Sequence, residues 1–193
     1  VLFRSAIRFV YEGINDLLKV MPDLSHEDRT ETDFGSYARE EFFSDMERLT
    51  QYRADPDLTT ILVDRSLETV IWMHSHGVRF VPSYHRQAFR VGGRFKFWGG
   101  LAAEVSGGGP GLVASLTGAV KRSGATILYD TRAVSLIQHD GIVCGVNVRK
   151  HGTTIPIKAK AVVLACGGFQ ANAQWRTSFL GPGWDLAKVR GTR

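Results

Sequence analysis

The 193-residue sequence predicts an α/β domain that is interrupted by a mainly helical insertion. Three observations predict this fold class. In the first half, apolar residues recur three or four positions apart, as on one face of a helix. In the second half, apolar runs rich in β-branched residues dominate, and a long glycine-rich segment separates the two halves. With 44% hydrophobic and 22% charged residues, the chain has the composition of a globular protein.

The first predicted element is a helix over Ser5 to Met21, which Pro22 ends. The polar stretch Asp23 to Asp33 then predicts a linker. A second, surface helix follows, because apolar residues recur at helical spacing among charges. The apolar residues are Ile7, Val10, Ile14, Leu17, Leu18 and Met21 in the first helix and Phe42, Met46 and Leu49 in the second.

A third helix is predicted to start at Asp55 and Pro56, because aspartate caps free N–H groups and proline fits the first helical turn. Gly77 supplies its C-terminal stop. The run Val78 to Val81 then predicts a short strand. The apolar positions of this helix are Leu58, Ile61, Leu62, Val70 and Met73.

The segment Ser83 to Gly109 has no sustained period and is predicted to be a loop. Cations alternate in it with aromatic residues. This mixture is typical of a site for a polycarboxylate, and equally of a solvated loop on an aromatic base. The cations are Arg86, Arg90, Arg94 and Lys96, and the aromatic residues are Phe89, Phe95, Phe97 and Trp98.

Pro110, which follows three glycines, predicts another helix that closes at Ser123 and Gly124. The glycines do not match a phosphate loop, because no lysine follows the last of them. A flexible hinge between two lobes is the alternative interpretation of these glycines. β-rich runs separated by turn-forming residues then predict a meander. The runs are Ala125 to Tyr129, Ala133 to Gln138, Ile142 to Arg149 and Thr154 to Lys158, with turns at Asp130, Asp140-Gly141 and His151-Gly152.

The run Ala161 to Ala165 is continuously apolar, as expected of a parallel strand buried on both faces. Gly167 and Gly168 follow at its carboxyl end, where ligands of parallel sheets bind. Because glycine has no Cβ, a nucleotide cofactor could approach the backbone at this point. A tight strand-to-helix turn without a ligand fits the same pattern.

Composition and spacing exclude several classes of site. The net charge is +5, but the 24 Lys and Arg residues are spread among 19 acidic residues, so nucleic acid is not an expected partner. Cys144 and Cys166 lack C-x-x-C spacing, which predicts two buried free thiols and no metal site. No histidine has an acid or nucleophile at a telling spacing, so no catalytic residue is assigned. Charges interrupt the apolar start, and we expect a cytoplasmic protein without a membrane span.

The stretch Gly124 to Phe169 resembles the FAD-binding half of the fumarate reductase and succinate dehydrogenase flavoproteins. In that family the chain leaves a mobile capping domain through a glycine-rich loop and helix, forms a T-R-V strand and a meander, and re-enters the FAD sheet at V-V-L-A-T-G-G-F. Here Ala133 replaces the usual valine and Cys166 the usual threonine. The motifs QYRADPDL, GVRFVP, GGRFKFWGG, GGGPGLV and FLGPGWDLAKVRGTR resemble the tricarballylate dehydrogenase branch.

The resemblance implies three regions and FAD as the cofactor. Residues 1–32 would be a remnant of a Rossmann-like FAD-binding domain, residues 33–106 a capping domain on the substrate side, and residues 107–193 the return to the FAD-binding domain. The backbone at Ala133 and Val134 would lie beside the adenine. Ala165, Gly167 and Gly168 would border the cofactor pocket.

The resemblance also implies a reaction. A small polycarboxylate, tricarballylate, would be oxidised to cis-aconitate by hydride transfer to FAD, and a membrane-bound or soluble electron acceptor would reoxidise the flavin. Arg94, Arg190 and Arg193 are the expected substrate-binding residues. The family's G-x-G-x-x-G unit, its N-T-G-D-G motif and its catalytic residues are not in this sequence, so we expect an inactive internal fragment. The alternatives are the flavoprotein part of a cobalamin-pathway oxidase, a ketosteroid-type flavin dehydrogenase and a truncated binding module.

Overall fold

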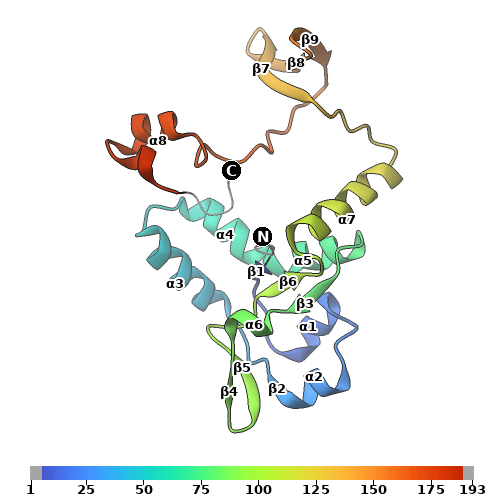
Figure 1. The fold of residues 1–193 in the computed structure, drawn as a ribbon, viewed down its shortest axis with the longest axis vertical. Helices are drawn as coiled ribbons and strands as arrows, with labels where there is room; N and C mark the ends of the chain where they lie inside the picture. The colour runs from blue at the N-terminus through green and yellow to red at the C-terminus, as the bar shows by residue number, and fades with distance from the viewer. Residues whose placement is uncertain (1–5, 189–193) are drawn as a thin grey trace. The chain divides into compact units, whose positions relative to one another are not determined.

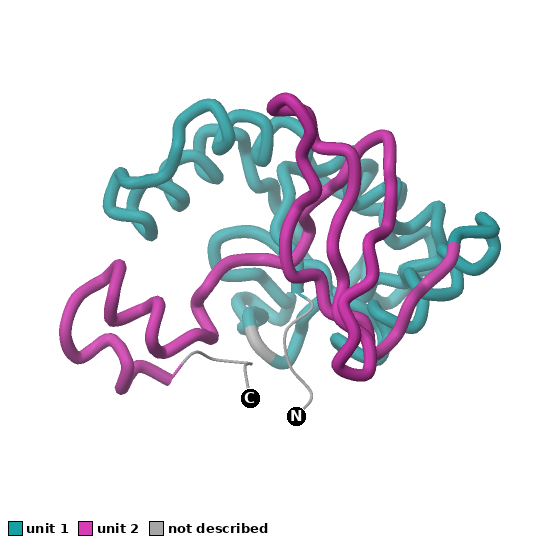
Figure 2. Tube along the Cα trace, turned by 90° about the horizontal axis from the view of Figure 1, so that it is seen from above, with its two compact units in different colours: residues 1–125 teal, residues 126–193 magenta. Residues whose placement is uncertain are grey.

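The computed structural model describes residues 6–188. The chain divides into two compact units, residues 1–125 and residues 126–193, which Figure 2 colours separately. Within the described residues, no helix has both the length and the apolar character needed to cross a membrane.

Two three-stranded sheets organise the first unit (Figure 1). In one sheet, β6 lies between β1 and β3 and pairs antiparallel with both. In the other, β5 pairs in parallel with β2 and forms an antiparallel hairpin with β4. The strands are β1 (Ala6–Ile7), β2 (Thr32–Asp33), β3 (Phe80–Pro82), β4 (Ala88–Val91), β5 (Arg94–Phe97) and β6 (Ala103–Val105).

One hydrophobic core joins these sheets to the helices of the first unit other than α2. Tyr11 is fully buried in it, and its hydroxyl donates a 2.6 Å hydrogen bond to the Phe34 carbonyl and accepts a 2.8 Å bond from the Leu101 N–H. Three distant segments therefore meet at one side chain. The helices are α1 (Ile14–Val20), α2 (His26–Glu31), α3 (Arg39–Thr50), α4 (Pro56–Asp64), α5 (Ser66–Ser75), α6 (Tyr84–Gln87) and α7 (Gly108–Arg122).

The predicted first helix is wrong in its N-terminal half. Residues 6–7 form β1, and Tyr11 makes an isolated antiparallel bridge with Tyr37. Gly13 has a φ of 108°, which no helix allows, so α1 begins only at Ile14. The physical reason is that Phe9 and Tyr11 are fully buried in the core and Tyr11 bonds to Phe34 and Leu101, far along the chain, which outweighs a helical spacing.

The predicted linker and the predicted loop both contain regular structure. In the linker, α2 starts with a capping box between Ser25 and Asp28. In the loop lie α6, the β4–β5 hairpin and β6. The hairpin turns at Gly92 and Gly93, whose φ values of 58° and 83° are those of a two-residue type I′ turn. The strands have only three or four residues each, which is too short for an alternation of apolar and polar residues to be recognised in the sequence.

Other predictions for the first unit are confirmed. The α3 and α7 helices form where expected, and β3 overlaps the second half of the predicted strand. The Asp55 carboxylate caps α4 by accepting bonds of 3.0 Å from the backbone N–H groups of Asp57 and Leu58. The third helix is divided, however. At Arg65 the backbone leaves helical geometry (φ −95°, ψ 0°), which separates α4 from α5.

The second unit contains the predicted meander and a shorter helical segment. The strands β7 (Thr131–His139), β8 (Ile142–Lys150) and β9 (Thr153–Lys158) pair antiparallel in sequence order. The predicted two-residue turns at Asp140-Gly141 and His151-Gly152 are confirmed, and all four residues have positive φ. No strand forms over residues 125–129. The helical segment contains α8 (Ala173–Leu180) and the 3₁₀ helix η1 (Trp184–Leu186).

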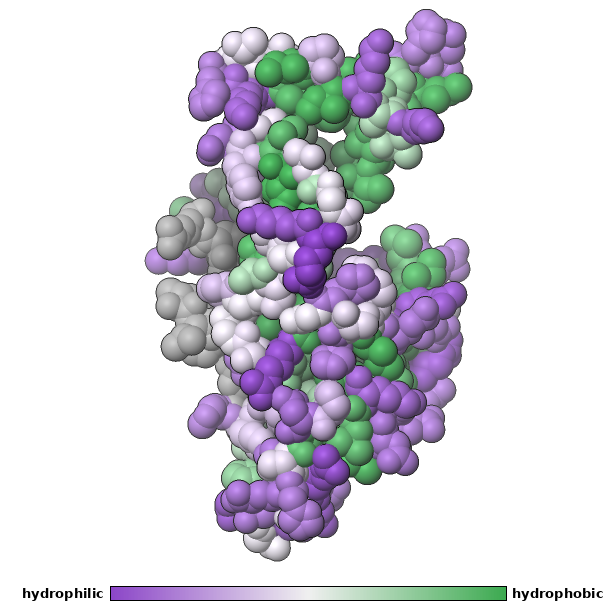
Figure 3. Space-filling view, turned by 90° about the vertical axis from the view of Figure 1, so that its right-hand side faces the viewer, coloured by the Kyte–Doolittle hydropathy of each residue, from purple (hydrophilic) through white to green (hydrophobic). Residues whose placement is uncertain are grey.

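The meander buries little of its apolar surface. Val148 is its only buried hydrophobic side chain among the described residues, while Val134 and Ile155 are 49% and 43% exposed. Apolar side chains also interrupt the polar surface in the space-filling view (Figure 3). A sheet of this kind normally needs cover on at least one face.

Candidate functional site

The predicted adenine contact coincides with an irregularity in the meander. Ala133 pairs with Val148 and Ser135 pairs with Asn147, so Val134 has no partner residue on β8. Such a bulge takes a residue out of the hydrogen-bonded ladder and leaves its peptide groups available to other partners. The register shift therefore leaves Val134, which is one of the residues implied by the family resemblance, without a partner on β8.

The predicted buried strand at Ala161 to Ala165 is not formed. The segment is extended but pairs with no described strand, and Val163 and Leu164 are 88% and 68% exposed. A central strand needs neighbours on both sides, and no described segment supplies them. Ala165 and the adjoining Cys166 are exposed as well, which corrects the expectation that both thiols are buried. Cys144 is half-buried and its thiol donates to the Ile137 carbonyl at 3.6 Å.

The two glycines after this segment differ in geometry. Gly167 has a φ of +70°, a conformation that other residues rarely adopt. Gly168 lies outside that region, and a Cβ built on it would meet only the Gln170 side-chain oxygen, at 2.8 Å. Of the two residues, only Gly167 therefore has a backbone conformation that requires glycine. At Gly168 a Cβ would displace only the Gln170 side chain, so the absence of a Cβ there matters mainly for a ligand that approaches the exposed backbone.

Arg176 on α8 holds the segment that follows the glycines. The residue is only 7% exposed. Its guanidinium donates four hydrogen bonds, all to backbone carbonyls, and these connect the residue after Phe169 to both ends of η1. The acceptors are Gln170 (2.6 Å), Trp184 (2.8 Å), Ala187 (3.0 Å) and Asp185 (3.1 Å). Sequence reasoning missed Arg176, because an arginine within a short helix is ordinarily solvated.

Of the predicted substrate-side arginines, Arg94 lies in the first unit and Arg190 and Arg193 lie outside the described residues. Arg94 is exposed on β5, and its Nη2 donates to the Thr32 carbonyl at 2.9 Å. It lines an open groove together with Asp33. The Lys96 ammonium hydrogen bonds to Asp33 and holds the pKa of that carboxyl below its ordinary value. The Arg90 guanidinium instead stacks 4.4 Å from the Phe95 ring centroid.

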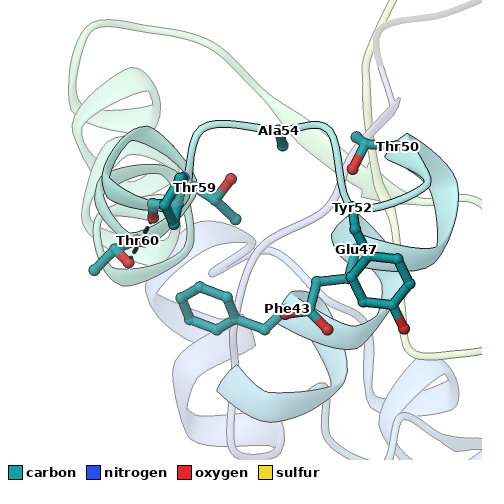
Figure 4. Close-up of a pocket in the computed structure, with 8 residues that line it drawn as sticks. Phe43, Glu47, Thr50, Tyr52, Ala54, Thr59 and Thr60 are labelled. Carbon is teal, nitrogen blue, oxygen red and sulfur yellow. Dashed lines mark hydrogen bonds between the residues drawn. The ribbon is translucent and has the colours of Figure 1, made fainter.

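A separate cavity of about 290 Å³ lies between α3 and α4 (Figure 4). Its wall includes Tyr52, which with Gln51 has positive φ in the turn that joins the two helices. None of the predicted site residues lines it, and Glu47 is its only charged residue. The cavity is lined by Phe43, Glu47, Thr50, Tyr52, Ala54, Pro56, Thr59 and Thr60.

These features define a mixed α/β chain with an exposed glycine pair after an extended segment and a bulged strand in an antiparallel meander. Residues 26–187 match the family model described as the FAD binding domain. The chain therefore belongs to the FAD binding domain family. This match confirms FAD as the predicted cofactor.

Two curated relatives are similar over part of their length. A probable fumarate reductase of Shewanella frigidimarina (strain NCIMB 400) is 30% identical over 135 residues, which is 69% of this chain and 22% of that protein. An NADH:acrylate oxidoreductase of Vibrio harveyi is 31% identical over 120 residues, which is 61% of this chain and 12% of that protein. The chain thus spans less than a quarter of either relative.

A solved structure shares the fold. It is the 3-ketosteroid-delta4-(5alpha)-dehydrogenase from Rhodococcus jostii, determined with 4-androstene-3,17-dione, and it is 19% identical with a TM-score of 0.65. The likeness covers 92% of this chain and 40% of that structure. At this identity the likeness concerns the fold alone.

Proposed function

We propose that the chain is part of an FAD-dependent dehydrogenase of the fumarate reductase type and forms one wall of its cofactor site. The observation that carries this proposal is the pair of backbone features in the second unit: the unpaired Val134, and the exposed glycine pair Gly167-Gly168 with its positive φ at Gly167. Both fit a flavin nucleotide, which such proteins hold largely through peptide groups. Ala133 and Ala165 flank these features and belong to the same proposed wall.

Each residue has a stated role in this proposal. The peptide of Val134 recognises the edge of the adenine ring. Gly167 supplies the positive φ that this segment requires and Gly168 leaves room for the cofactor, while the bonds of Arg176 fix the backbone that follows them. When bound, FAD supplies the hydride acceptor, and the protein supplies position and electrostatics. Residues 1–32 and 107–193 are assigned to the FAD-binding domain and residues 33–106 to the capping domain.

The proposed substrate is a small polycarboxylate, tricarballylate in particular, which would be oxidised to cis-aconitate. Support comes from the names of the two curated relatives, which both concern carboxylates. Arg94 is the described candidate for substrate binding, since a guanidinium holds a carboxylate through two charge-assisted bonds. Arg190 and Arg193 remain part of the proposal. A membrane-bound or soluble carrier would reoxidise the flavin.

A steroid substrate is the second candidate, because the solved structure that shares the fold is a ketosteroid dehydrogenase. A neutral ring system would require an apolar site. The groove beside Arg94 contains two guanidinium groups, which favours an anion.

A substrate panel separates the two candidates. In the enzyme that contains this sequence, steady-state rates would be measured with an artificial electron acceptor for tricarballylate, succinate and 4-androstene-3,17-dione. We expect turnover of tricarballylate, weaker turnover of succinate and none of the steroid. Turnover of the steroid alone would replace the polycarboxylate assignment while leaving the flavin assignment intact.

A further inference from the structure

The groove beside Arg94 has an apolar floor and a charged rim. Phe34 forms part of the floor and is only 6% exposed, and Ile14 and Leu18 of α1 are half-buried beside it. The cavity measures about 510 Å³, which is within the range of small-molecule sites. It lies wholly within the first unit and is lined by Ile14, Leu18, Arg29, Thr32, Asp33, Phe34, Gly35 and Arg94.

Two guanidinium groups on the rim are oriented by the backbone. Arg29 of α2 donates its Nε–H to the Leu24 carbonyl at 3.1 Å, and Arg94 of β5 donates from Nη2 to the Thr32 carbonyl at 2.9 Å. Each bond uses one side of the guanidinium and leaves further N–H donors free of protein partners among the described residues. Such anchoring reduces the conformational entropy that a ligand must otherwise restrict.

The charges around the groove single out the same two residues. Arg79 pairs with Asp23 at 2.6 Å, Arg90 with Glu31 at 3.6 Å and Lys96 with Asp33 at 2.9 Å. Asp33, the acid of the groove, is therefore already matched. In residues 6–188, neither Arg29 nor Arg94 has a carboxylate within 4.0 Å.

We propose that Arg29 and Arg94 together bind a small carboxylate whose carbon skeleton packs on Phe34. Both guanidinium groups engage ligand oxygens, so a dicarboxylate binds better than a monocarboxylate. The inference deepens the proposed function, because it adds Arg29 to the substrate side and gives the site its apolar floor. It concerns binding only and needs no flavin.

The test is a titration of the ¹⁵N-labelled 193-residue chain with fumarate at low ionic strength, without FAD. We expect saturable amide shifts at Phe34 and Gly35. Arg29→Gln and Arg94→Gln should each weaken fumarate binding about three- to tenfold, a modest effect because both groups are exposed. The variant with both substitutions should no longer bind fumarate. Arg79→Gln removes a cation that already has an acidic partner and should leave the affinity unchanged.

Two further ligands keep the proposal falsifiable even if a variant unfolds. Fumaramide has the same skeleton without charge, and inorganic phosphate has charge without the skeleton. Equal shifts from fumaramide, equal affinity for phosphate, or no saturable shift at millimolar fumarate would each overturn the proposal. Such a result would not argue against the flavin assignment. Conversely, a failure to bind flavin would not argue against carboxylate binding in the groove.

Discussion

At the scale of single residues, Arg176 makes the densest set of interactions in the second unit. A buried guanidinium without an acidic partner in the described chain is held by neutral carbonyls alone. Bonds from a charged donor contribute more than neutral ones, and their loss leaves carbonyl oxygens without donors. The geometry of the turn after Gly168 therefore depends on a residue that no sequence pattern marked.

Replacement of Arg176 should loosen the helical segment. Arg176→Met is expected to destabilise residues 170–187 by at least about 2 kcal/mol, and Arg176→Lys by less, because an ammonium cannot reach all four carbonyls. Amide hydrogen exchange in α8 would then rise by about tenfold or more. Arg132→Met, which removes an exposed arginine of β7, is the matched control. Unchanged exchange in Arg176→Met would refute the role given to this side chain.

The two glycines should respond differently to valine. At Gly167 a β-branched residue would have to adopt a φ of +70°, so Gly167→Val should destabilise the turn itself. At Gly168 only the flexible Gln170 side chain must move, so Gly168→Val should fold normally and lose flavin because its side chain occupies the cofactor space. Thermal melts and flavin absorbance would be measured for the enzyme carrying each substitution separately. Full flavin content in Gly168→Val would remove the residue from the pocket.

At the scale of elements, α2 shows how a helix without buried residues is stabilised. Its N-terminus has the capping box of Ser25 and Asp28. The Asp28 carboxylate also accepts a 2.9 Å bond from the Tyr84 hydroxyl, which lies 2.9 Å from the Thr32 hydroxyl. Tyr84 in turn packs on Phe95 and Phe97 of β5. Tyr84 therefore adds a side-chain connection between α2 and the second sheet, beside the direct continuation of α2 into β2 and the Glu31–Arg90 pair.

This tie predicts a loss of stability in alkaline solution. Burial, together with the nearby carboxylates Asp28 and Glu31, raises the pKa of Tyr84 to about 12 from an ordinary value of 10.0. Folding thus favours the neutral phenol, so the contribution is complete below about pH 10 and is lost as the pH rises towards about 12. Urea unfolding across this range should show a smaller pH dependence for Tyr84→Phe than for the wild type. The variant should not become pH-independent, because burial and Asp45 also raise the pKa of Tyr37 to about 12.

The elements also show what sequence can and cannot predict. Local signals located α3, the Asp55 cap, α7 and the two meander turns, because each depends on neighbouring residues. The β1–β6 pairing and the burial of Tyr11 depend on contacts about 90 residues or more away, which no local period records. The apolar run at Ala161 to Ala165 predicted a strand, but a strand forms only beside another strand.

The residues of the candidate site also divide into those that the sequence indicated and those that it did not. The glycines and Val134 are proposed from motif resemblance, and their side-chain chemistry matters little in that proposal. Arg29 and Arg176 were missed, because their significance comes from backbone carbonyls and neighbours that are distant in the sequence or lie in irregular segments.

At the scale of the whole molecule, the two units differ in how they are stabilised. The first unit contains the shared hydrophobic core, whereas the second exposes Val163, Leu164, Phe179 and Leu186. The exposed set includes the apolar run that precedes the glycine turn. Because the sequence contains no G-x-G-x-x-G unit for the pyrophosphate, we expect the isolated chain to purify colourless and to bind FAD weakly.

Weak binding can still be mapped, and the map tests the flavin assignment most directly. The measurement is a titration of the ¹⁵N-labelled chain with FAD, following backbone amides in both units. We expect the amides of Val134, Gly167 and Gly168 to shift together and to report one dissociation constant. AMP should reproduce the shift at Val134 and leave the glycines less affected. Shifts confined to the first unit, or none at Val134 and the glycine turn at millimolar FAD, would contradict the proposed cofactor wall.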